Sequence, residues 1–338
     1  MTDRNRKWHI AFYMLLTLVL TCTPVSRLFT SHTAAAVILF LETGHILRLP
    51  PETQPPTTTP PPTTLPSATV PPQTVLPETT APTVEPETTP PETMPTFSPS
   101  DAELVEVNNY CGYAPDVPAW LAQPLSWDLQ QPEPTVLILH SHGTESYKNT
   151  ENTGYRSQNR SENLVSVGDA LAELLEEAGI GVVHDRAMHD HPSYSDAYAN
   201  SRESAQKYLK QYPSVRLILD LHRDSVEDNS GNQIPYTLET AGGTAAKMMF
   251  VVGTDAGGLA HSKWSENMSL AVKLHALLEK KNPGICRPIS FRTQRFNQDL
   301  STGALLIEMG SAGNSRQEAL LAAQLLAEAI IDLAKGTV

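Results

Sequence analysis

The stretch T-V-L-I-L-H-S-H-G-T-E-S-Y, residues 135–147, joins a strand to a loop rich in metal-binding side chains. Its four apolar residues, 136–139, are typical of a short buried β-strand. His140, His142 and Glu145 follow directly. Imidazole and carboxylate groups after a buried strand are typical of a metal site at the edge of an α/β sheet. A complete site needs further ligands from elsewhere in the chain.

The composition bounds the class of protein. The chain has 338 residues and a formal net charge of −13. Because an acidic surface repels phosphate backbones, this charge argues against a nucleic-acid partner. Cys22 lies in an apolar segment, which leaves Cys111 and Cys286. These two predict either a pair of free thiols or one bridge.

Residues 1–49 are predicted to form a membrane anchor with its flank. Basic residues precede an apolar run from Trp8 to about Val25, which is close to the roughly 20 residues that a bilayer core requires. The positive-inside rule leaves the N-terminus in the cytoplasm and makes a single-pass protein with an extracytoplasmic remainder. A cleaved signal peptide, processed near residues 22–24, is the alternative, and it exports the remainder as well.

Residues 50–102 are predicted to be a disordered linker, and residues 103–338 a globular head. Residues 51–100 contain 16 Pro and 15 Thr, with no Lys or Arg. Proline removes backbone donors, and so few apolar residues cannot build a core. Such a segment is a semi-rigid spacer that holds the head away from the membrane. The head is long enough to bury a sizeable single core.

The head alternates apolar runs of strand length with amphipathic stretches of helix length. The predicted strands cover residues 136–139, 181–184, 215–221, 248–252 and 305–307. The predicted helices cover about 162–178, 194–211, 262–281 and 315–334, and an irregular stretch is predicted over 225–244. This alternation is typical of βαβ units, so we expect an α/β fold with a mainly parallel sheet and helices on both faces.

Three of the predicted strands end in metal-competent or ionisable residues. They run into His140 and His142, into His222, and into Glu308. In open α/β sheets, functional groups gather beyond the carboxyl ends of the strands. If these strands are parallel neighbours, we expect the groups to meet in one crevice.

The residue types in this crevice fit a catalytic zinc site. Two His and one Glu form a known catalytic set with a fourth position open to water, and His142, Glu145 and His222 supply it. His140 is interpreted as a neighbour rather than a ligand, and Glu162 is a rival to Glu145. Zinc hydrolases also need a carboxylate that takes up and returns a proton, for which Glu308 is the candidate.

The remaining reactive side chains are interpreted more simply. The His and Asp residues between 184 and 191 are interpreted as a solvated or substrate-facing loop. His261 and His275 are interpreted as surface residues near a helix. Cys286 lacks a local cysteine-protease signature, which argues against a thiol nucleophile.

Five motifs of the head, in their order and spacing, resemble the stage II sporulation protein P (SpoIIP) family. They are H-S-H-G-T-E-S-Y, V-G-D-A-L-A-E-L-L-E-E-A-G-I-G-V-V-H-D, D-L-H-R-D, F-N-Q-D-L and L-L-I-E-M-G-S-A-G-N. The resemblance covers about residues 134–335, and an anchor followed by a spacer also suits the family. Because the family is similar to zinc N-acetylmuramoyl-L-alanine amidases, the resemblance implies an amidase-like fold.

The resemblance also implies an activity and a setting. It implies a Zn²⁺-dependent amidase that hydrolyses peptidoglycan, with endopeptidase activity on peptide cross-links in addition. It implies action during spore engulfment with stage II sporulation protein D, a lytic transglycosylase that acts on the denuded glycan. The location that it implies is the cell membrane, with the catalytic domain in the space between mother cell and forespore.

The resemblance assigns residues only where the motifs match. The zinc histidines fall on His142 and His222, and the catalytic glutamate falls on Glu308. The carboxylate ligand falls near Glu162 in the wider amidases, whereas the local H-x-x-E spacing indicates Glu145. Two other functions stay open from the sequence, namely a peptidase acting only on cross-bridges and a non-catalytic wall-binding scaffold.

Overall fold

The computed structural model describes residues 96–148 and 154–336, all of them within the compact unit Val84–Val338. The predicted anchor and the linker up to residue 95 lie outside the described residues. Within the described part of the chain, no helix has the length and apolar character needed to cross a bilayer. The first described element, a 3-10 helix over Pro99–Leu104 (η2), packs against the C-terminal part of helix α6 (Trp264–Lys281) through an ion pair of Asp101 with Lys280 at 3.0 Å.

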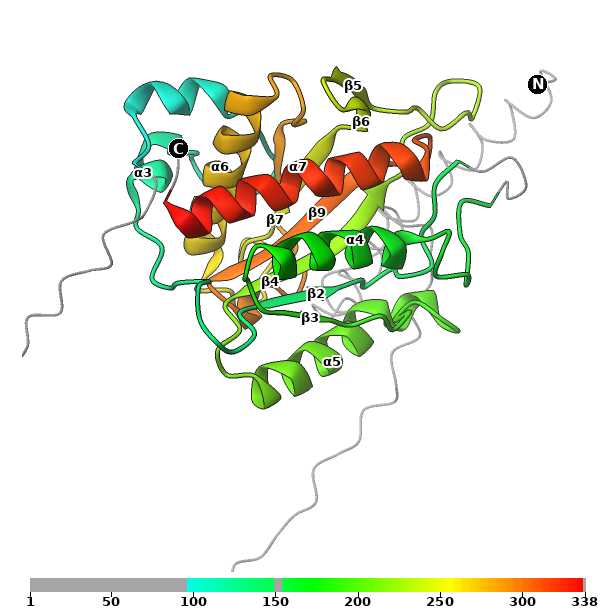
Figure 1. Ribbon diagram of the computed structural model, residues 1–338, viewed down its shortest axis with the longest axis horizontal. Coiled ribbons are helices and arrows are strands. Elements are labelled where there is room, and N and C mark those ends of the chain that lie inside the picture. Colours follow the sequence, from blue (N-terminus) through cyan, green and yellow to red (C-terminus); the bar gives the residue numbers. More distant parts are fainter. Residues whose placement is uncertain (1–95, 149–153, 337–338) are drawn as a thin grey trace, which may run out of the picture. The chain divides into compact units, whose positions relative to one another are not determined.

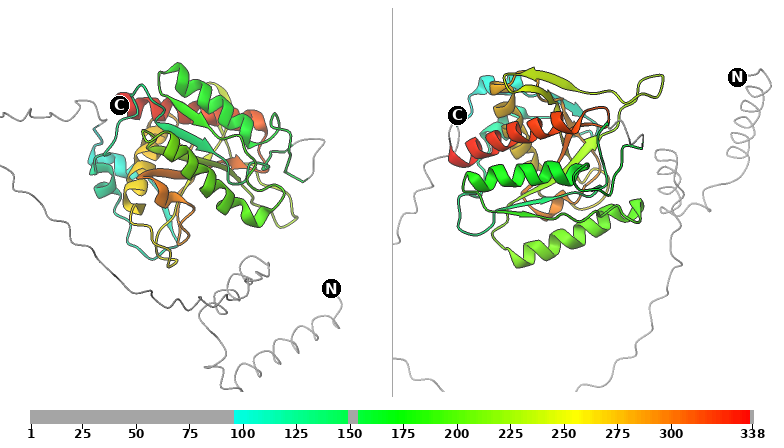
Figure 2. Two further views of the ribbon diagram at one scale, coloured as in Figure 1. Left: turned by 90° about the horizontal axis from the view of Figure 1, so that it is seen from below. Right: turned by 45° about the vertical axis from the view of Figure 1, so that its right-hand side comes forward.

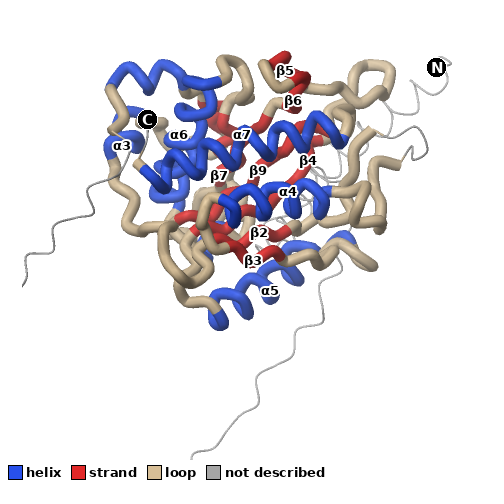
Figure 3. The backbone as a smooth tube through the Cα atoms, in the orientation of Figure 1, coloured by secondary structure: helices blue, strands red, loops and turns tan. Residues whose placement is uncertain are grey.

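The core of the head is a seven-stranded sheet with the order β1-β8-β7-β9-β4-β2-β3 (Figures 1 and 3). Its strands are β1 (Val107–Asn109), β2 (Val136–Leu139), β3 (Val182–His184), β4 (Leu217–Asp224), β7 (Met248–Val252), β8 (Ile289–Phe291) and β9 (Gly303–Ser311). A separate hairpin pairs β5 (Thr237–Thr240) with β6 (Gly243–Ala246). The predicted α/β fold with a mainly parallel sheet is therefore confirmed.

The sheet consists of two parallel blocks that run in opposite directions. Strands β9, β4, β2 and β3 are mutually parallel, and so are β7, β8 and β1. The blocks meet at β7 and β9, which pair antiparallel, with Val251 opposite Leu306. The sequence does not predict this reversal, because an apolar run such as 248–252 reads the same in either direction.

The helices cover the two faces of the sheet unequally (Figures 1 and 2). They are α3 (Val117–Ala122), α4 (Leu164–Glu177), α5 (Ala197–Gln211), α6 (Trp264–Lys281) and α7 (Arg316–Lys335), with the short 3-10 helices η3 (Tyr194–Asp196) and η4 (Gln298–Leu300). The main core lies between the sheet and α4, α6 and α7. A small second core on the other face contains Leu137, Leu139 and Ile218 together with Ala205 of α5. Among the described α-helices only α5 covers this second face, which leaves the face open over β9, β7 and β8.

Local sequence signals fix α4 where the site needs it. Asn163 caps its start by accepting from the Val165 amide at 3.0 Å, and Gly179 follows its end with φ 87°, a left-handed conformation that favours glycine. Within the helix, a Cβ on Gly168 would lie 2.7 Å from His140 Nε2. The missing side chain therefore lets α4 lie directly on the end of β2.

Several elements were not predicted from the sequence. Strands β1 and β8 and helix α3 are short, and the β5–β6 hairpin falls in the stretch predicted as irregular. The prediction that His261 and His275 lie at the surface is wrong, because they are only 1% and 2% exposed. Every residue of α6 from Asn267 to Leu278 is buried, so the helix has no solvent face for His275 to occupy.

Candidate active site

Three adjacent parallel strands bring the predicted site residues together. β4 lies between β2 and β9, with Leu219 paired to Ile138 on one side and to Leu305 on the other. His222 and Glu308 are direct register partners. The expectation that the three strands are parallel neighbours is confirmed, although β4 and β9 extend further than predicted, so His222 and Glu308 lie within these strands rather than beyond their ends.

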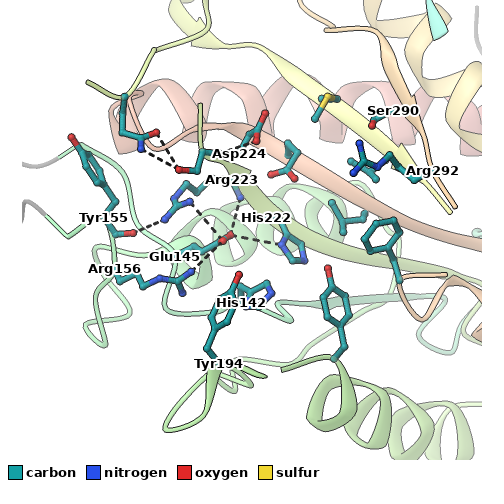
Figure 4. A pocket seen from close by; sticks show the side chains of 18 of the residues that line it. His142, Glu145, Tyr155, Arg156, Tyr194, His222, Arg223, Asp224, Ser290 and Arg292 are labelled. Atoms are coloured by element: carbon teal, nitrogen blue, oxygen red, sulfur yellow. Dashed lines mark hydrogen bonds and ion pairs between the residues drawn. The ribbon is translucent and has the colours of Figure 1, made fainter. Parts of the chain in front are cut away.

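These residues line a cleft of about 760 Å³ on the open face of the sheet (Figure 4). Side chains alternate along a strand, so residues two apart share a face. The cleft floor follows this rule and is made by His222 and Asp224, Leu306 and Glu308, Met249 and Val251, and Ser290. The walls come from the loop after β2, the segment after β8, η3, the start of α5 and the end of β4. They include His142, Glu145, Tyr155, Arg156, Tyr194, Tyr198, Arg223, Arg292 and Phe296.

His142, Glu145 and His222 lie together at one part of the cleft. Their exposed fractions are 7%, 5% and 4%. Glu145 Oε2 lies 3.7 Å from His222 Nδ1 and accepts from the backbone amide of Arg223 at 3.1 Å. The rings of His142 and His222 are perpendicular, with centroids 5.4 Å apart. The loop after β2 therefore delivers two of the predicted ligands to the end of β4.

Carboxylates surround His222 and favour positive charge there. Burial by itself would lower the pKa of His222, but Asp220, Glu145 and Glu308 outweigh this and raise the pKa to about 9. His222 Nε2 lies 3.1 Å from Asp220 Oδ1, although the two are not aligned for a hydrogen bond. A site that stabilises a protonated imidazole so strongly would also stabilise a bound cation.

Glu308 is a carboxyl group suited to proton transfer. Its Oε2 is enclosed and has no hydrogen-bond partner, while the rest of the side chain borders the cleft. Burial raises the pKa of Glu308 to about 8; His222 opposes the rise, and Glu145 adds to it. A carboxyl group poised near neutral pH can both accept and donate a proton.

The two remaining predicted candidates lie elsewhere. His140 is fully buried behind the sheet, where its Nε2 lies 2.9 Å from His184 Nε2. Burial, and then His184, lower the pKa of His140 to about 3. Glu162 is exposed and accepts from Ser157 at 3.0 Å and from Asn159 at 2.9 Å. The structure therefore brings Glu145 into the cleft and leaves His140 and Glu162 outside it.

Asp220 links the segments that carry His142 and His222, and it was not identified from the sequence. Asp220 accepts from the Ser141 amide at 2.8 Å and from the Ser141 hydroxyl at 2.6 Å. It thereby ties the loop that carries His142 to the strand that carries His222. Its position two residues before His222 puts both side chains on one face of β4, and this spacing could have identified it.

The loop after β3, predicted to be solvated or substrate-facing, is solvated only in part, since His191 is exposed whereas Asp185, His189 and Asp190 are buried. Asp185 and His189 are buried and joined at 2.9 Å. Asp190 is buried as well, accepts from Arg156 at 2.9 Å and lies 4.0 Å from His142 Nδ1. These contacts therefore hold the loop after β3 in place against His142.

Tyrosines enclose the two cleft histidines. The Tyr194 ring stacks on His142 at 4.3 Å, and the Arg156 guanidinium lies 4.6 Å above the same tyrosine ring. Tyr198 is stacked with His222 at 6.3 Å and meets His142 edge-on. These contacts restrict how the imidazoles can rotate.

The arrangement was tested against the zinc expected from the sequence. Within residues 96–148 and 154–336, no group of three or more His, Cys, Asp or Glu side chains already has the arrangement of a metal site. Two ligand atoms on a tetrahedral zinc ion lie roughly 3.3 Å apart given bonds of about 2 Å, which is near the 3.7 Å between His222 Nδ1 and Glu145 Oε2. Nδ1 of His142 is buried without a hydrogen-bond partner. The donor types fit zinc, and Glu145 and His222 already lie near the spacing that one zinc ion needs.

Residues 73–331 match the family described as Stage II sporulation protein P (SpoIIP). A curated relative, Stage II sporulation protein P of Bacillus subtilis (strain 168), is 29% identical over 212 residues, which cover 59% of this chain and 50% of the relative. The chain thus spans about half the length of the curated relative that it matches.

Two solved structures are similar to about 60% of this chain. One is the N-acetylmuramoyl-L-alanine amidase AmiC2 of Nostoc punctiforme, with a TM-score of 0.37, 15% identity and 94% of that chain covered. The other is an N-acetylmuramoyl-L-alanine amidase from Clostridium difficile 630, with a TM-score of 0.36, 16% identity and 95% covered. The family match, by contrast, spans most of the sequence and includes the segments that carry His142, Glu145, His222 and Glu308. The chain belongs to the stage II sporulation protein P (SpoIIP) family.

Proposed function

We propose that this protein is a zinc-dependent peptidoglycan hydrolase that cleaves the amide between N-acetylmuramic acid and the L-alanine of the stem peptide. The observation that carries the proposal is the convergence of His142, Glu145 and His222 beside Glu308 in one cleft. Membership of the SpoIIP family supports it independently.

In the proposed site, His142, Glu145 and His222 hold the metal. When bound, zinc supplies Lewis-acid polarisation of the scissile carbonyl, acidifies water and lowers the pKa of Glu308 through its charge. Asp220 keeps the His222 ring in place, and the Arg223 amide holds one oxygen of Glu145. Because backbone and buried groups fix the ligands, little reorganisation is needed on binding.

Glu308 performs the proton transfers. As a carboxylate it takes one proton from the water that attacks the lactyl carbonyl of muramic acid. It then returns that proton to the nitrogen of L-alanine as the C–N bond breaks. The products are a muramic acid with a free carboxyl group and a stem peptide with a free amine, so the protons balance without another acid.

We further propose that the head works from the cell membrane during spore engulfment. The apolar run near the N-terminus and the Pro/Thr-rich spacer support an anchored, extracytoplasmic hydrolase in the space between mother cell and forespore. Stage II sporulation protein D is the proposed partner, since removal of stem peptides would expose the glycan on which a lytic transglycosylase acts.

The proposal is tested by the products formed from purified peptidoglycan. Full-length protein is incubated with sacculi and zinc, with and without a chelator, and the released material is analysed by mass spectrometry. We expect free stem peptides and intact glycan strands, and no release with the chelator. Release only of cleaved cross-bridges would replace the amidase by a cross-bridge peptidase, and binding without any release would indicate a wall-binding scaffold.

A further inference from the structure

The cleft contains three arginines, and two of them are already engaged by protein groups. Arg156 pairs with Asp190 at 2.9 Å. Arg223 donates to backbone carbonyls at 2.9 and 2.7 Å and lies 3.7 Å from Glu145. These two guanidiniums therefore belong to the framework around the proposed metal ligands.

Arg292 differs from both. It is half-buried, lines the cleft and forms no ion pair with any residue that the structure describes. Its guanidinium lies 4.9 Å from the centre of the Tyr110 ring. The backbone holds the residue in place, because its amide donates to Val252 at 2.8 Å and its carbonyl accepts from Thr254 at 2.9 Å. A guanidinium that has no carboxylate partner and rests on an aromatic ring in a cleft can bind an anionic group of a ligand.

The position of Arg292 relative to the reacting bond can be read from the sheet. Arg292 follows β8, which is two strands away from β9 and Glu308. The Arg292 amide donates to Val252 at the end of β7. On the same strand Met249 lies opposite Glu308, so Arg292 is displaced from Glu308 by about three to four residues along the strands. Two strand spacings of about 4.8 Å and this offset give a diagonal of roughly 15 Å between the backbone positions.

An extended peptide of about four residues spans this distance at 3.3–3.6 Å per residue. The floor between the two points is the sheet face formed by Leu306, Met249, Val251 and Ser290. Figure 4 shows Ser290 and Arg292 on one side of His222, with Tyr155 and Arg156 on the other. A stem peptide whose first amide lies at Glu308 would therefore bring its third and fourth residues to Arg292.

We infer that Arg292 binds a free carboxylate on the third or fourth residue of the stem peptide and so selects stems by their charge. This inference rests on the proposed function, since it takes the scissile amide to lie beside Glu308. The two carboxyl groups of the floor, Asp224 and Glu308, cannot attract an acidic peptide end, and Asp224 is already paired with Arg287 at 2.7 Å. Arg292 thus fixes the direction in which the peptide lies along the cleft.

The experiment measures binding rather than turnover. The full-length protein carries Glu308→Gln so that the probe stays intact. The acidic probe is an N-acetylmuramoyl tetrapeptide with free carboxylates on its third and fourth residues. The neutral probe has carboxamides at the same positions. Dissociation constants are measured by calorimetry in zinc buffer, in the parent and after a further Arg292→Gln or Arg292→Lys substitution.

We expect the parent to bind the acidic probe about tenfold more tightly than the neutral one, which is the range of a charge-assisted hydrogen-bonded pair. Arg292→Gln removes this preference and leaves binding of the neutral probe unchanged, and Arg292→Lys retains part of it. Arg295→Ala is the matched control, since Arg295 lies three residues on and is already paired with Asp299 at 3.2 Å. A parent without preference, or a preference that persists in Arg292→Gln, overturns the inference.

The same probes separate this inference from the proposed function. Wild-type protein is incubated with the acidic probe, and release of the tetrapeptide is measured. An Arg292-dependent preference without release would support the binding site and contradict the amidase. Release without any Arg292-dependent preference would support the amidase and overturn the inference about Arg292.

Discussion

His222 and Glu308 stand directly opposite each other in the parallel pairing of β4 and β9. The pairing sets their side chains on the same face of the sheet, at the strand spacing of about 4.8 Å. The proposed metal ligand and the proposed proton carrier are therefore positioned by backbone hydrogen bonds rather than by mobile loops. Such placement on a rigid element keeps the geometry of a site constant.

Glu308→Gln is expected to lower the rate of stem-peptide release by on the order of 10²- to 10⁴-fold, because the amide cannot exchange protons. Gln has nearly the same shape, so zinc content is expected to stay unchanged. Release rates and metal content are measured on the same samples. Glu176→Gln, on an exposed position of α4, is the control, and near-normal release by the Glu308 variant would contradict its assigned function.

Glu145→Gln and Glu162→Gln form a matched pair that identifies the carboxylate ligand. Glu145 lies in the cleft beside His222, whereas Glu162 faces solvent. We expect Glu145→Gln to weaken zinc binding by more than about 100-fold, beyond the loss typical of an outer partner, and Glu162→Gln to leave it unchanged. Competition with a chromogenic chelator gives both affinities. The reverse order would assign the ligand to Glu162.

Asp220→Asn tests the support beneath the histidines. The substitution weakens the interaction with His222 and the hold on Ser141 while keeping the size of the side chain. We expect zinc affinity to fall by about 10- to 100-fold, as for other groups that orient a ligand. Excess zinc should then restore part of the release activity. An affinity equal to that of the wild type would show that His222 needs no such support.

The raised pKa of Glu308 predicts how the stability of the metal-free protein depends on pH. The folded-state pKa of about 8 lies above the usual 4.5, so the folded state binds more protons than the unfolded state between these values. Stability from this group is full below about pH 4.5 and is lost as the pH rises through 8. We expect the melting temperature of wild-type protein in chelator to fall relative to Glu308→Gln between about pH 5 and 9. Melting curves whose difference stays constant would contradict the shift.

Lys273→Met tests a buried cap at the end of α3. The Lys273 ammonium group is 2% exposed and donates to the carbonyls of Trp120, Leu121 and Gln123 at 2.7–2.8 Å. Burial lowers its pKa to about 8, so the charged form still dominates at neutral pH. Loss of these bonds is expected to cost about 2–4 kcal/mol, measured by denaturant unfolding. Lys207→Met, at an exposed ion pair, should change little.

Much of the fold and site was predictable because the decisive residues follow uninterrupted apolar runs. His142, His222 and Glu308 each follow an apolar run of strand length in the sequence, so their gathering needs only that the strands be parallel neighbours. The choice between Glu145 and Glu162 depended on tertiary structure. Asn163 caps the start of α4 with extended backbone, which leaves Glu162 in the turn before the helix, where it is exposed.

Other parts of the site had no local signal. Arg292 follows a strand of three residues that includes Ser290, too short and too polar to stand out. The Asp190 carboxylate accepts a hydrogen bond from the Thr144 amide, which lies 46 residues away in sequence, so no local pattern reveals this contact. The burial of His275 depends on neighbours on every side of α6, which an amphipathic pattern cannot reveal.

The reversal of strand direction between β7 and β9 places the groups proposed for chemistry and the group proposed for stem recognition on oppositely directed strands. The loop after β2 and the strands β4 and β9 carry the groups proposed for chemistry, whereas the segment that follows β8 carries Arg292 and comes from the oppositely directed block. If Arg292 binds the stem as proposed, exchange of residues 292–297 between relatives would alter which stem is accepted without moving a proposed metal ligand. Recognition of the stem and the proposed hydrolysis could then change independently in this scaffold.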